Sequence, residues 1–201
     1  MQKQRLFYLC QFINNFVETE ELLLAKIALK LVLNSDKIQL TVKRLAQQLL
    51  ENHVQLKNTV LIGLQPRGIY LSDRIVEELK REEPVVAFNY GKLDITFYRD
   101  DVRRELHIAN QTVINFSIEE KNVVLIDDVL YTGRTIRAAL DALMDFGRPA
   151  KVELMVLIDR RYSRQLPIQP DYTGKAIDSI ITQKVKVLWQ GKDGKDEVVL
   201  I

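Results

Sequence analysis

An apolar run that ends in two adjacent acids constrains the fold of this chain more than any other feature. The stretch reads VVLIDDVLYTGRT over residues 123–135, and a helical pattern follows from Arg134 to Phe146. Such a run indicates a fully buried strand, and strands of this kind do not normally end in paired acids without a use for them. One acid suffices to cap the following helix, so the second acid indicates a ligand site.

Strand and helix patterns alternate along most of the chain, which predicts an α/β domain with a mostly parallel sheet. In such sheets ligands bind at the carboxyl ends of the strands, so Asp127 and Asp128 are expected at a site. Helices are expected from Ser35 to Leu50, from Gly68 to Arg81 and from Arg134 to Phe146. Strands are expected at 58–64, 84–90, 93–98, 112–116, 122–128 and 151–159, with a hairpin of 185–189 and 197–201.

The residues after the two acids suit an anion. Thr132 and Thr135 offer hydroxyls, Gly133 permits close approach of the backbone, and the first turn of the helix has free N–H groups. A phosphate therefore fits this loop, and a sugar bearing hydroxyls fits Asp127 and Asp128. The alternative is an ordinary capped turn between a strand and a helix. A Walker loop is excluded because no Gly-Lys-Ser/Thr follows.

A second loop of the same kind follows the strand expected at 58–64. Arg67 is a natural ligand for pyrophosphate, because its planar guanidinium donates two parallel hydrogen bonds. Gly68 opens the next helix with bare N–H groups. The loop alone is a weak signal, but the two loops together indicate a phosphorylated sugar ligand.

Composition and the N-terminal segment exclude several other classes of protein. The formal charge of +2 does not suggest a general polyanion binder, and the single Cys10 excludes an internal disulfide and a cysteine metal cluster. His53 and His107 are too far apart to suggest a metal site, so each is expected at the surface or in a loop. Residues 1–32 are expected to form two short amphipathic helices. Their apolar stretch is short and interrupted by lysines, so no membrane span is expected and the cytoplasm is the expected location.

Together the two loops resemble those of the type I phosphoribosyltransferases, which bind phosphoribosyl pyrophosphate (PRPP). The resemblance implies that Asp127 and Asp128 hold the ribose hydroxyls, and that Arg67 faces the pyrophosphate. It also implies a cis peptide at Pro66–Arg67 and Mg²⁺ held mainly by PRPP, without a protein metal site. The implied PRPP-binding residues are Pro66, Arg67, Gly68, Leu130, Tyr131, Thr132, Gly133, Arg134 and Thr135.

From about Leu33 to the C-terminus, the chain resembles the pyrimidine operon regulators, which are also uracil phosphoribosyltransferases. The resemblance rests on DITFYRDD (94–101), GRPAKVEL (147–154), LIDR (157–160) and LPIQPDYTGK (166–175). It implies a flexible loop over PRPP and a hood over the base after Asp159. The implied loop residues are Arg99, Asp100, Asp101 and Arg103, and the implied base-binding residues are Ile158, Asp159 and Arg160.

Three departures from that family bear on RNA binding and on base choice. Residues 161–164 are one residue longer than the family stretch, and Gln169 stands where an arginine is expected. On the first matched helix, Lys43 and Gln47 replace the threonine and histidine of the family's RNA-binding face. The resemblance therefore predicts only weak RNA binding.

The resulting expectation is a type I phosphoribosyltransferase core at 33–201, with a hood, preceded by a helical extension at 1–32. The expected enzyme converts PRPP and uracil into UMP and pyrophosphate, and forms a homo-oligomer of two or more chains. Two alternatives stay open. One is a nucleotide-sensing, RNA-binding regulator with little or no catalysis, and the other is a phosphoribosyltransferase for another base, such as hypoxanthine or orotate.

Overall fold

The structure is a computed structural model that describes residues 30–99, 110–179 and 183–201, apart from the side chain of Gln55. The chain divides into two compact units, which are described separately. The larger unit is Ser35–Thr182, and the smaller one combines Met1–Asn34 with Gln183–Ile201.

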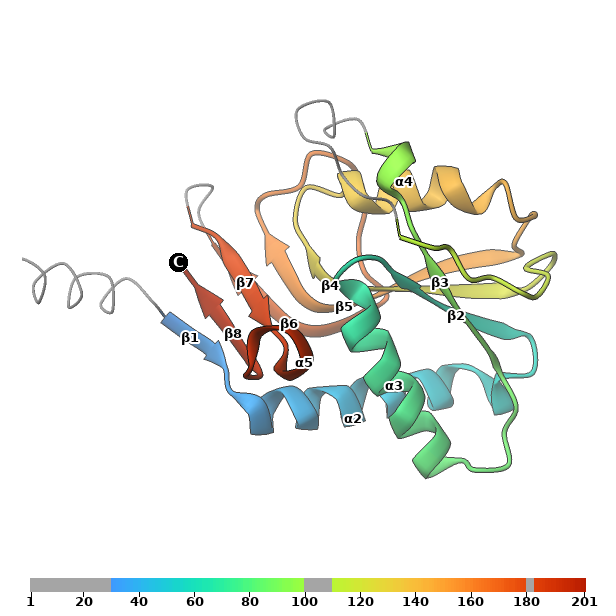
Figure 1. Ribbon diagram of the computed structural model, residues 1–201, viewed down its shortest axis with the longest axis horizontal. Coiled ribbons are helices and arrows are strands. Elements are labelled where there is room, and N and C mark those ends of the chain that lie inside the picture. The colour runs from blue at the N-terminus through green and yellow to red at the C-terminus, as the bar shows by residue number, and fades with distance from the viewer. Residues whose placement is uncertain (1–29, 100–109, 180–182) are drawn as a thin grey trace, which may run out of the picture. The chain divides into compact units, whose positions relative to one another are not determined.

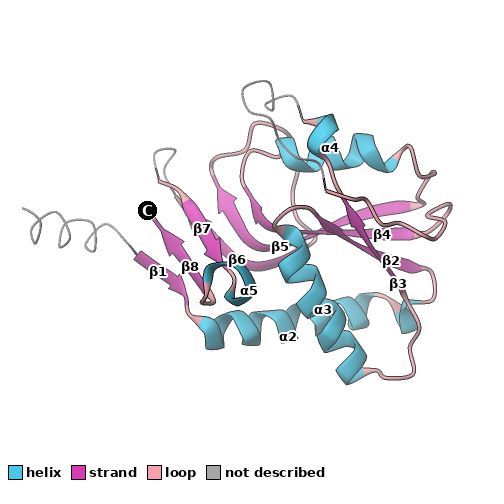
Figure 2. Cartoon of the chain, viewed as in Figure 1, coloured by secondary structure: helices cyan, strands magenta, loops and turns pink. Residues whose placement is uncertain are grey.

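A five-stranded parallel sheet forms the centre of the larger unit (Figures 1 and 2). Its strand order is β3-β2-β4-β5-β6, and every neighbouring pair is parallel. The α/β architecture and the parallel sheet expected from the alternating pattern are therefore confirmed. The strands are β2 (Thr59–Leu64), β3 (Asn89–Leu93), β4 (Asn122–Leu130), β5 (Lys151–Arg161) and β6 (Tyr172–Asp178).

Helices cover both faces of this sheet. In Figure 1, α2 (Ser35–Asn52) and α3 (Gly68–Glu82) lie on one face and α4 (Arg134–Leu143) lies on the other. Short 3-10 helices occupy Val54–Leu56 and Thr96–Tyr98. Successive residues of a strand point to opposite faces, so β2 and β4 contribute apolar side chains to two layers. The layer beneath α4 contains Val60, Ile62, Val123, Leu125, Ile136, Ala139 and Leu143.

The smaller unit contains a three-stranded antiparallel sheet in the order β1-β8-β7. Strands β7 (Val185–Leu188) and β8 (Glu197–Leu200) form the expected hairpin, with α5 (Gln190–Asp193) between them. Strand β1 (Lys30–Leu33) pairs with β8, so the helix expected through residue 32 is wrong for its last three residues. Pairing with β8 supplies their backbone hydrogen bonds. The other residues of the expected helical extension lie outside the described part of the chain.

The edge at β3 differs from the sequence expectation. Two strands were expected at 84–90 and 93–98, but one strand passes through Gly91 and ends at Leu93. The carboxylate of Asp94 accepts the N–H of Thr96 at 2.6 Å and turns the chain into a 3-10 helix. The strand expected at 112–116 forms only one isolated bridge, between Val113 and Lys92.

Strand β6 was not expected, and its composition explains why. It contains Gly174, a residue depleted in strands, and it follows a stretch with two prolines. A side chain at Gly174 would place its Cβ 2.4 Å from the carbonyl oxygen of Leu157 in β5. The glycine is therefore required by the close approach of a neighbouring backbone.

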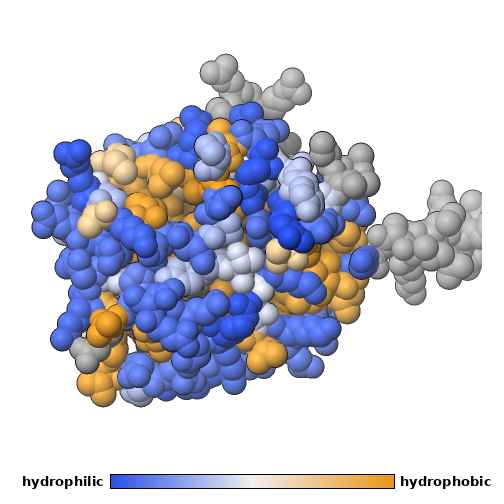
Figure 3. Space-filling model, turned by 180° about the vertical axis from the view of Figure 1, so that it is seen from behind, coloured by the Kyte–Doolittle hydropathy of each residue, from blue (hydrophilic) through white to orange (hydrophobic). Residues whose placement is uncertain are grey.

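Figure 3 shows one face, on which separate apolar areas interrupt the polar surface. Within the described ranges, no helix is both long enough and apolar enough to cross a membrane.

Candidate functional site

The two acids of the apolar run lie near the carboxyl end of the central strand β4. The strand continues to Leu130 because its partner β5 also continues, with Leu130 opposite Asp159. Asp127 and Asp128 therefore lie within the strand, three and two residues before its end. Both are only 7% exposed.

Asp127 and Asp128 are adjacent carboxyl groups, and their burial disfavours the charged form of both. Burial raises the pKa of Asp127 well above the ordinary value, and the charge of Asp128 raises it further. Burial also raises the pKa of Asp128, although Arg67 opposes this effect. The Arg67 Nε donates to Asp128 Oδ2 at 3.1 Å. A ligand that brings hydroxyl donors or positive charge to this pair would relieve its electrostatic cost.

The start of α3 packs directly against the acids. A Cβ added to Gly68 would lie 2.5 Å from the carbonyl oxygen of Ile126 and 2.9 Å from the Cα of Asp127. Only glycine fits there, so the first turn of α3 lies beside the acid pair. The structure thus brings together the two loops that the sequence singled out.

The cis peptide of this region is at Gln65–Pro66, and the expectation of a cis bond at Pro66–Arg67 is wrong. The bond before a proline is a tertiary amide, and its preference for the trans form is much weaker than that of other peptide bonds. It is the only cis bond in the described residues.

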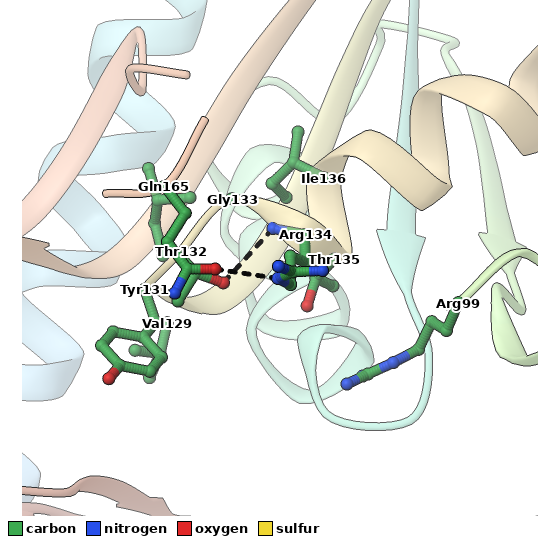
Figure 4. A pocket seen from close by; sticks show the side chains of 10 residues that line it. Arg99, Val129, Tyr131, Thr132, Gly133, Arg134, Thr135, Ile136 and Gln165 are labelled. Atoms are coloured by element: carbon green, nitrogen blue, oxygen red, sulfur yellow. Dashed lines mark hydrogen bonds between the residues drawn. The ribbon is translucent and has the colours of Figure 1, made fainter. Parts of the chain in front are cut away.

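The loop after β4 lines a pocket of about 380 Å³ (Figure 4). Gly133 has a φ of 93°, in the left-handed region that favours glycine, and α4 begins at the next residue. The Thr132 hydroxyl accepts the backbone N–H of Arg134 at 3.5 Å. The lining residues are Arg99, Val129, Leu130, Tyr131, Thr132, Gly133, Arg134, Thr135, Ile136 and Gln165. All six loop residues predicted to bind PRPP therefore lie around one pocket, beside the N-terminal end of α4.

Arg99 reaches the same pocket from a different segment. It follows the 3-10 helix Thr96–Tyr98, and Figure 4 shows its side chain extending toward the loop. Of the four predicted flexible-loop residues, Asp100, Asp101 and Arg103 lie outside the described residues.

The predicted base-binding residues lie at the carboxyl end of β5. Ile158 is fully buried and lies between Val129 of β4 and Lys175 of β6. The Arg160 guanidinium lies 3.9 Å from the centroid of the Tyr131 ring, and its Nε donates to Ser179 Oγ at 2.9 Å. Asp159 accepts a hydrogen bond from Arg164. Arg160 thus meets the loop after β4 at Tyr131.

The connection from β5 to β6 contributes residues that the sequence analysis missed. Arg164 donates to the backbone carbonyl of Tyr131 as well as to Asp159. The N–H groups of Gln165 and Leu166 donate to the carbonyl of Thr132 at 3.0 and 3.3 Å. The unusual length of residues 161–164 was visible in the sequence, but nothing there showed what they contact.

On α2, which carries Lys43 and Gln47, the side chain of Arg44 is used within the fold. The Arg44 guanidinium donates to the carbonyls of Thr173 and Gly174 in β6, at 3.2 and 2.5 Å, and to Gln48 at 3.3 Å. These contacts hold its charge against the edge of the sheet.

A second buried polar cluster lies at the opposite, amino ends of the strands. His53 Nε2 lies 2.8 Å from Glu153 Oε2, and Tyr172 donates to the same oxygen at 2.9 Å. Thr59 Oγ1 lies 3.0 Å from His53 Nδ1, and Lys151 donates to Glu153 Oε1 at 2.6 Å. His53 lies in the bend after α2, so the expected loop position is confirmed, but its side chain is only 9% exposed and the alternative of a surface position is wrong. His107 lies outside the described residues.

Residues 30–190 match the phosphoribosyl transferase domain family. The chain is 45% identical over 182 residues to the bifunctional protein PyrR of Actinobacillus pleuropneumoniae serotype 5b, covering 86% of this chain and 96% of that protein. It is 46% identical over 171 residues to the bifunctional protein PyrR of a Picosynechococcus strain, covering 85% and 96%.

Solved structures of lower sequence identity share the fold. A hypoxanthine phosphoribosyltransferase from Trypanosoma cruzi superposes with a TM-score of 0.68 at 17% identity, covering 86% of this chain and 94% of that one. One from Staphylococcus aureus gives a TM-score of 0.60 at 23% identity, covering 78% and 83%. With the paired acids, the two loops and the parallel sheet, these matches show that the chain belongs to the type I phosphoribosyltransferases, and within them to the PyrR family.

Proposed function

We propose that this protein is a uracil phosphoribosyltransferase that converts PRPP and uracil into UMP and pyrophosphate. The observation that carries the proposal is the buried pair Asp127 and Asp128, of which Asp128 contacts Arg67, and which is followed directly by the pocket-lining loop that ends at Thr135. A phosphorylated sugar needs acceptors for its hydroxyls and donors for its phosphates. This edge of the sheet offers both kinds of group.

Each group has a separate task in binding the substrate. Asp127 and Asp128 accept hydrogen bonds from the ribose 2′- and 3′-hydroxyls. The backbone N–H groups from Leu130 to Thr135, at the start of α4, hold the 5′-phosphate. Arg67 and the N-terminal turn of α3 face the pyrophosphate.

The reaction breaks the bond between the anomeric carbon and a pyrophosphate oxygen and forms a bond from that carbon to a uracil nitrogen. The uracil N–H proton is released. Positive charge develops on the ribose ring, and the two carboxylates below it stabilise that charge. Positioning therefore replaces a protein nucleophile: Arg67 offsets charge on pyrophosphate while β5 holds the base in line.

We also propose Mg²⁺ as the metal that accompanies PRPP. No group of three or more histidine, cysteine, aspartate or glutamate side chains in the described ranges is placed to hold a metal. Mg²⁺ commonly binds through substrate phosphates together with one or two carboxylates, so PRPP would mainly hold the ion, and Asp127 and Asp128 are the carboxylates that this site offers beside it. When bound, the ion offsets negative charge on the pyrophosphate.

Release of pyrophosphate from PRPP tests the proposal with a panel of bases. We expect Mg²⁺-dependent release with uracil and little with hypoxanthine or orotate. Preference for a purine would contradict the assignment. Absence of turnover with every base, together with tight binding of UMP, would favour a nucleotide sensor.

Regulation through RNA is the second candidate function, because the relatives named above are called bifunctional. We propose that RNA binding here is weak and sequence-tolerant, since Arg44 is engaged with β6 and Lys43 and Gln47 replace the expected groups. Titration of a labelled pyrimidine attenuator RNA and a scrambled control at two salt concentrations measures this. A nanomolar preference for the attenuator, enhanced by UMP, would restore the dual role.

Two further expectations belong to the proposal: a cytoplasmic location and self-association into dimers or larger homo-oligomers. Several large apolar side chains are exposed, among them Phe97 at 85% and Met144 at 55%. Such side chains are suitable contacts for a second copy. Sedimentation at several concentrations measures the oligomeric state.

A further inference from the structure

The connection between β5 and β6 lies against residues 131–135, the loop proposed above for the 5′-phosphate and called the phosphate loop below, through a set of polar contacts. Arg164 donates from Nη2 to Asp159 and from Nη1 to the carbonyl of Tyr131. We call this two-ended contact the Arg164 bridge. Its ends belong to the strand end that would meet the base and to the loop that would hold the 5′-phosphate.

Neighbouring contacts hold the same two segments together. The amides of Gln165 and Leu166 share the carbonyl of Thr132, and the Arg134 Nε donates to Gln165 Oε1 at 2.9 Å. Leu166 and Ile168 lie over Gly133, 3.4 and 3.2 Å from the position that a Cβ there would occupy. The connection therefore covers the left-handed glycine of the loop.

Tyr131 is held from two directions. Arg164 binds its backbone carbonyl, and the Arg160 guanidinium stacks on its ring at 3.9 Å. Arg160 is only 4% exposed, so its position depends strongly on that ring and on Ser179. Displacement of Tyr131 would move the surface that supports Arg160.

We propose that Arg164 is a positioning residue for the base site: its bridge fixes Tyr131 relative to Asp159, and Tyr131 in turn supports Arg160. The proposal rests on the proposed function, since it assigns the end of β5 to the base. It adds a residue that does not touch the substrate. It also gives a purpose to the stretch at which this chain departs in length from the family it resembles.

A bridge needs the guanidinium and not only a positive charge. The planar fork of arginine presents several N–H groups in fixed directions, so it serves a carboxylate and a carbonyl at once. Lysine would keep the ion pair with Asp159 but would lose the fixed second contact with Tyr131. Arg164→Lys therefore distinguishes a role of the two-ended contact from a role of the positive charge beside Asp159 alone.

The kinetic test compares Arg164→Gln, Arg164→Lys and Arg161→Gln. Arg161 is a matched control: it lies three residues away and pairs with Asp178 at 2.7 Å, but both members of that pair are half exposed. We expect both Arg164 variants to raise KM for uracil about tenfold, as loss of a charged hydrogen bond implies. We expect kcat and KM for PRPP to change less than about threefold, and the control to resemble the wild type, because exposed ion pairs contribute little.

Hydrogen exchange provides a measurement that does not depend on turnover. The amides of Gln165 and Leu166 should exchange faster in Arg164→Gln and Arg164→Lys, while the Leu154 amide, bound to Asp171 at 2.8 Å, should not change. Rescue of both KM and exchange by lysine would overturn the bridge. A larger fall in kcat than rise in KM for uracil would also overturn it. Failure of the wild type to use any base would contradict the proposed function, and unchanged exchange would contradict the bridge.

Discussion

The parallel sheet carries a buried polar cluster at each end of its strands, and the two clusters differ in how their charges are satisfied. At the carboxyl end, Asp127 and Asp128 lie side by side with Arg67 as the nearby cation. At the amino end, Glu153 accepts hydrogen bonds from Lys151 and Tyr172 and lies beside His53. The first cluster has two negative charges close together, and the second has one carboxylate surrounded by donors.

The pKa directions express the same difference. Burial raises the pKa of Asp127, and its acidic neighbour adds to the rise. Burial alone would also raise the pKa of Glu153, but hydrogen bonds from Lys151, His53 and Tyr172 outweigh it and lower the value. A cluster that stabilises the fold uses its donors internally, whereas a cluster that binds a ligand keeps acceptors for the ligand.

Substitution of Glu153 should give the largest effect on stability. Glu153→Ala removes the acceptor of several buried hydrogen bonds, and such losses cost about 3 kcal/mol of the free energy of unfolding. Urea denaturation measures this, and kcat/KM at a permissive temperature should stay within about threefold of wild type. Asp141→Ala is the control, because Asp141 is exposed and pairs with Arg137 only at 3.8 Å. Equal losses in the two variants would contradict the structural role of the cluster.

Substitution of the acid pair should have the reverse effect: it should lower kcat/KM without lowering stability. Asp127→Asn and Asp128→Asn should each lower kcat/KM by roughly ten- to a hundredfold, because a neutral amide is a weaker acceptor for the ribose hydroxyls. The free energy of unfolding should not fall in Asp127→Asn, since the substitution removes a buried charge beside Asp128. Steady-state kinetics and urea denaturation on the same samples check both statements. Wild-type kinetics in both variants would show that the acids do not hold the ribose of PRPP.

A substitution at the junction of α3 and β4 should reduce both the free energy of unfolding and kcat/KM. Gly68→Ala forces a methyl group toward the backbone of Ile126 and Asp127, and overpacking of this kind costs about 1.5 kcal/mol. We expect a lower melting temperature and a higher KM for PRPP. Gly191→Ala is the control, because an added Cβ there meets nothing within 4 Å. A crystal structure of Gly68→Ala in which the acid pair is undisturbed would contradict this explanation of the loss of stability and PRPP binding.

The pH dependence of stability should differ in sign between the two clusters. We expect this effect to be smaller than those of the substitutions above. The raised pKa of Asp127 means that its contribution to stability is present below the ordinary carboxyl value and is lost as pH rises through the folded-state value. The lowered pKa of Glu153 means that its contribution is present above the ordinary value and is lost as pH falls through the folded-state value.

Unfolding of Asp127→Asn and Glu153→Gln between acidic and neutral pH measures these contributions by difference from the wild type. Relative to the wild type, Asp127→Asn should gain stability as pH rises, and Glu153→Gln should lose it. Parallel curves for the two variants would show that the clusters do not differ in this way.

The loop that we propose for the 5′-phosphate was predictable as a candidate site because its residues are contiguous. Asp127 to Thr135 form one strand, one turn and the start of one helix, so the chemistry is visible along the sequence. The amino-end cluster was not predictable, since His53 and Glu153 are 100 residues apart and meet only in the folded sheet. The Arg164 bridge joins residues 33 positions apart for the same reason.

Element boundaries failed where side chains override the apolar pattern. Val85 lies in an apolar stretch expected to be a strand, yet it is 94% exposed and outside β3. The carboxylate of Asp94 ends β3 by binding the N–H of Thr96. Local hydrogen bonds of this kind compete with strand pairing, and an apolar pattern does not reveal them.

The contact of Arg44 with β6 has a consequence for the behaviour of the protein in concentrated solution. Strand β6 is an edge of the five-stranded sheet, and exposed edge carbonyls are templates on which a strand of another molecule can add. The Arg44 guanidinium covers the carbonyls of Thr173 and Gly174, and its charge opposes the approach of a second chain. We therefore expect Arg44 to disfavour strand addition, and with it aggregation, at this edge.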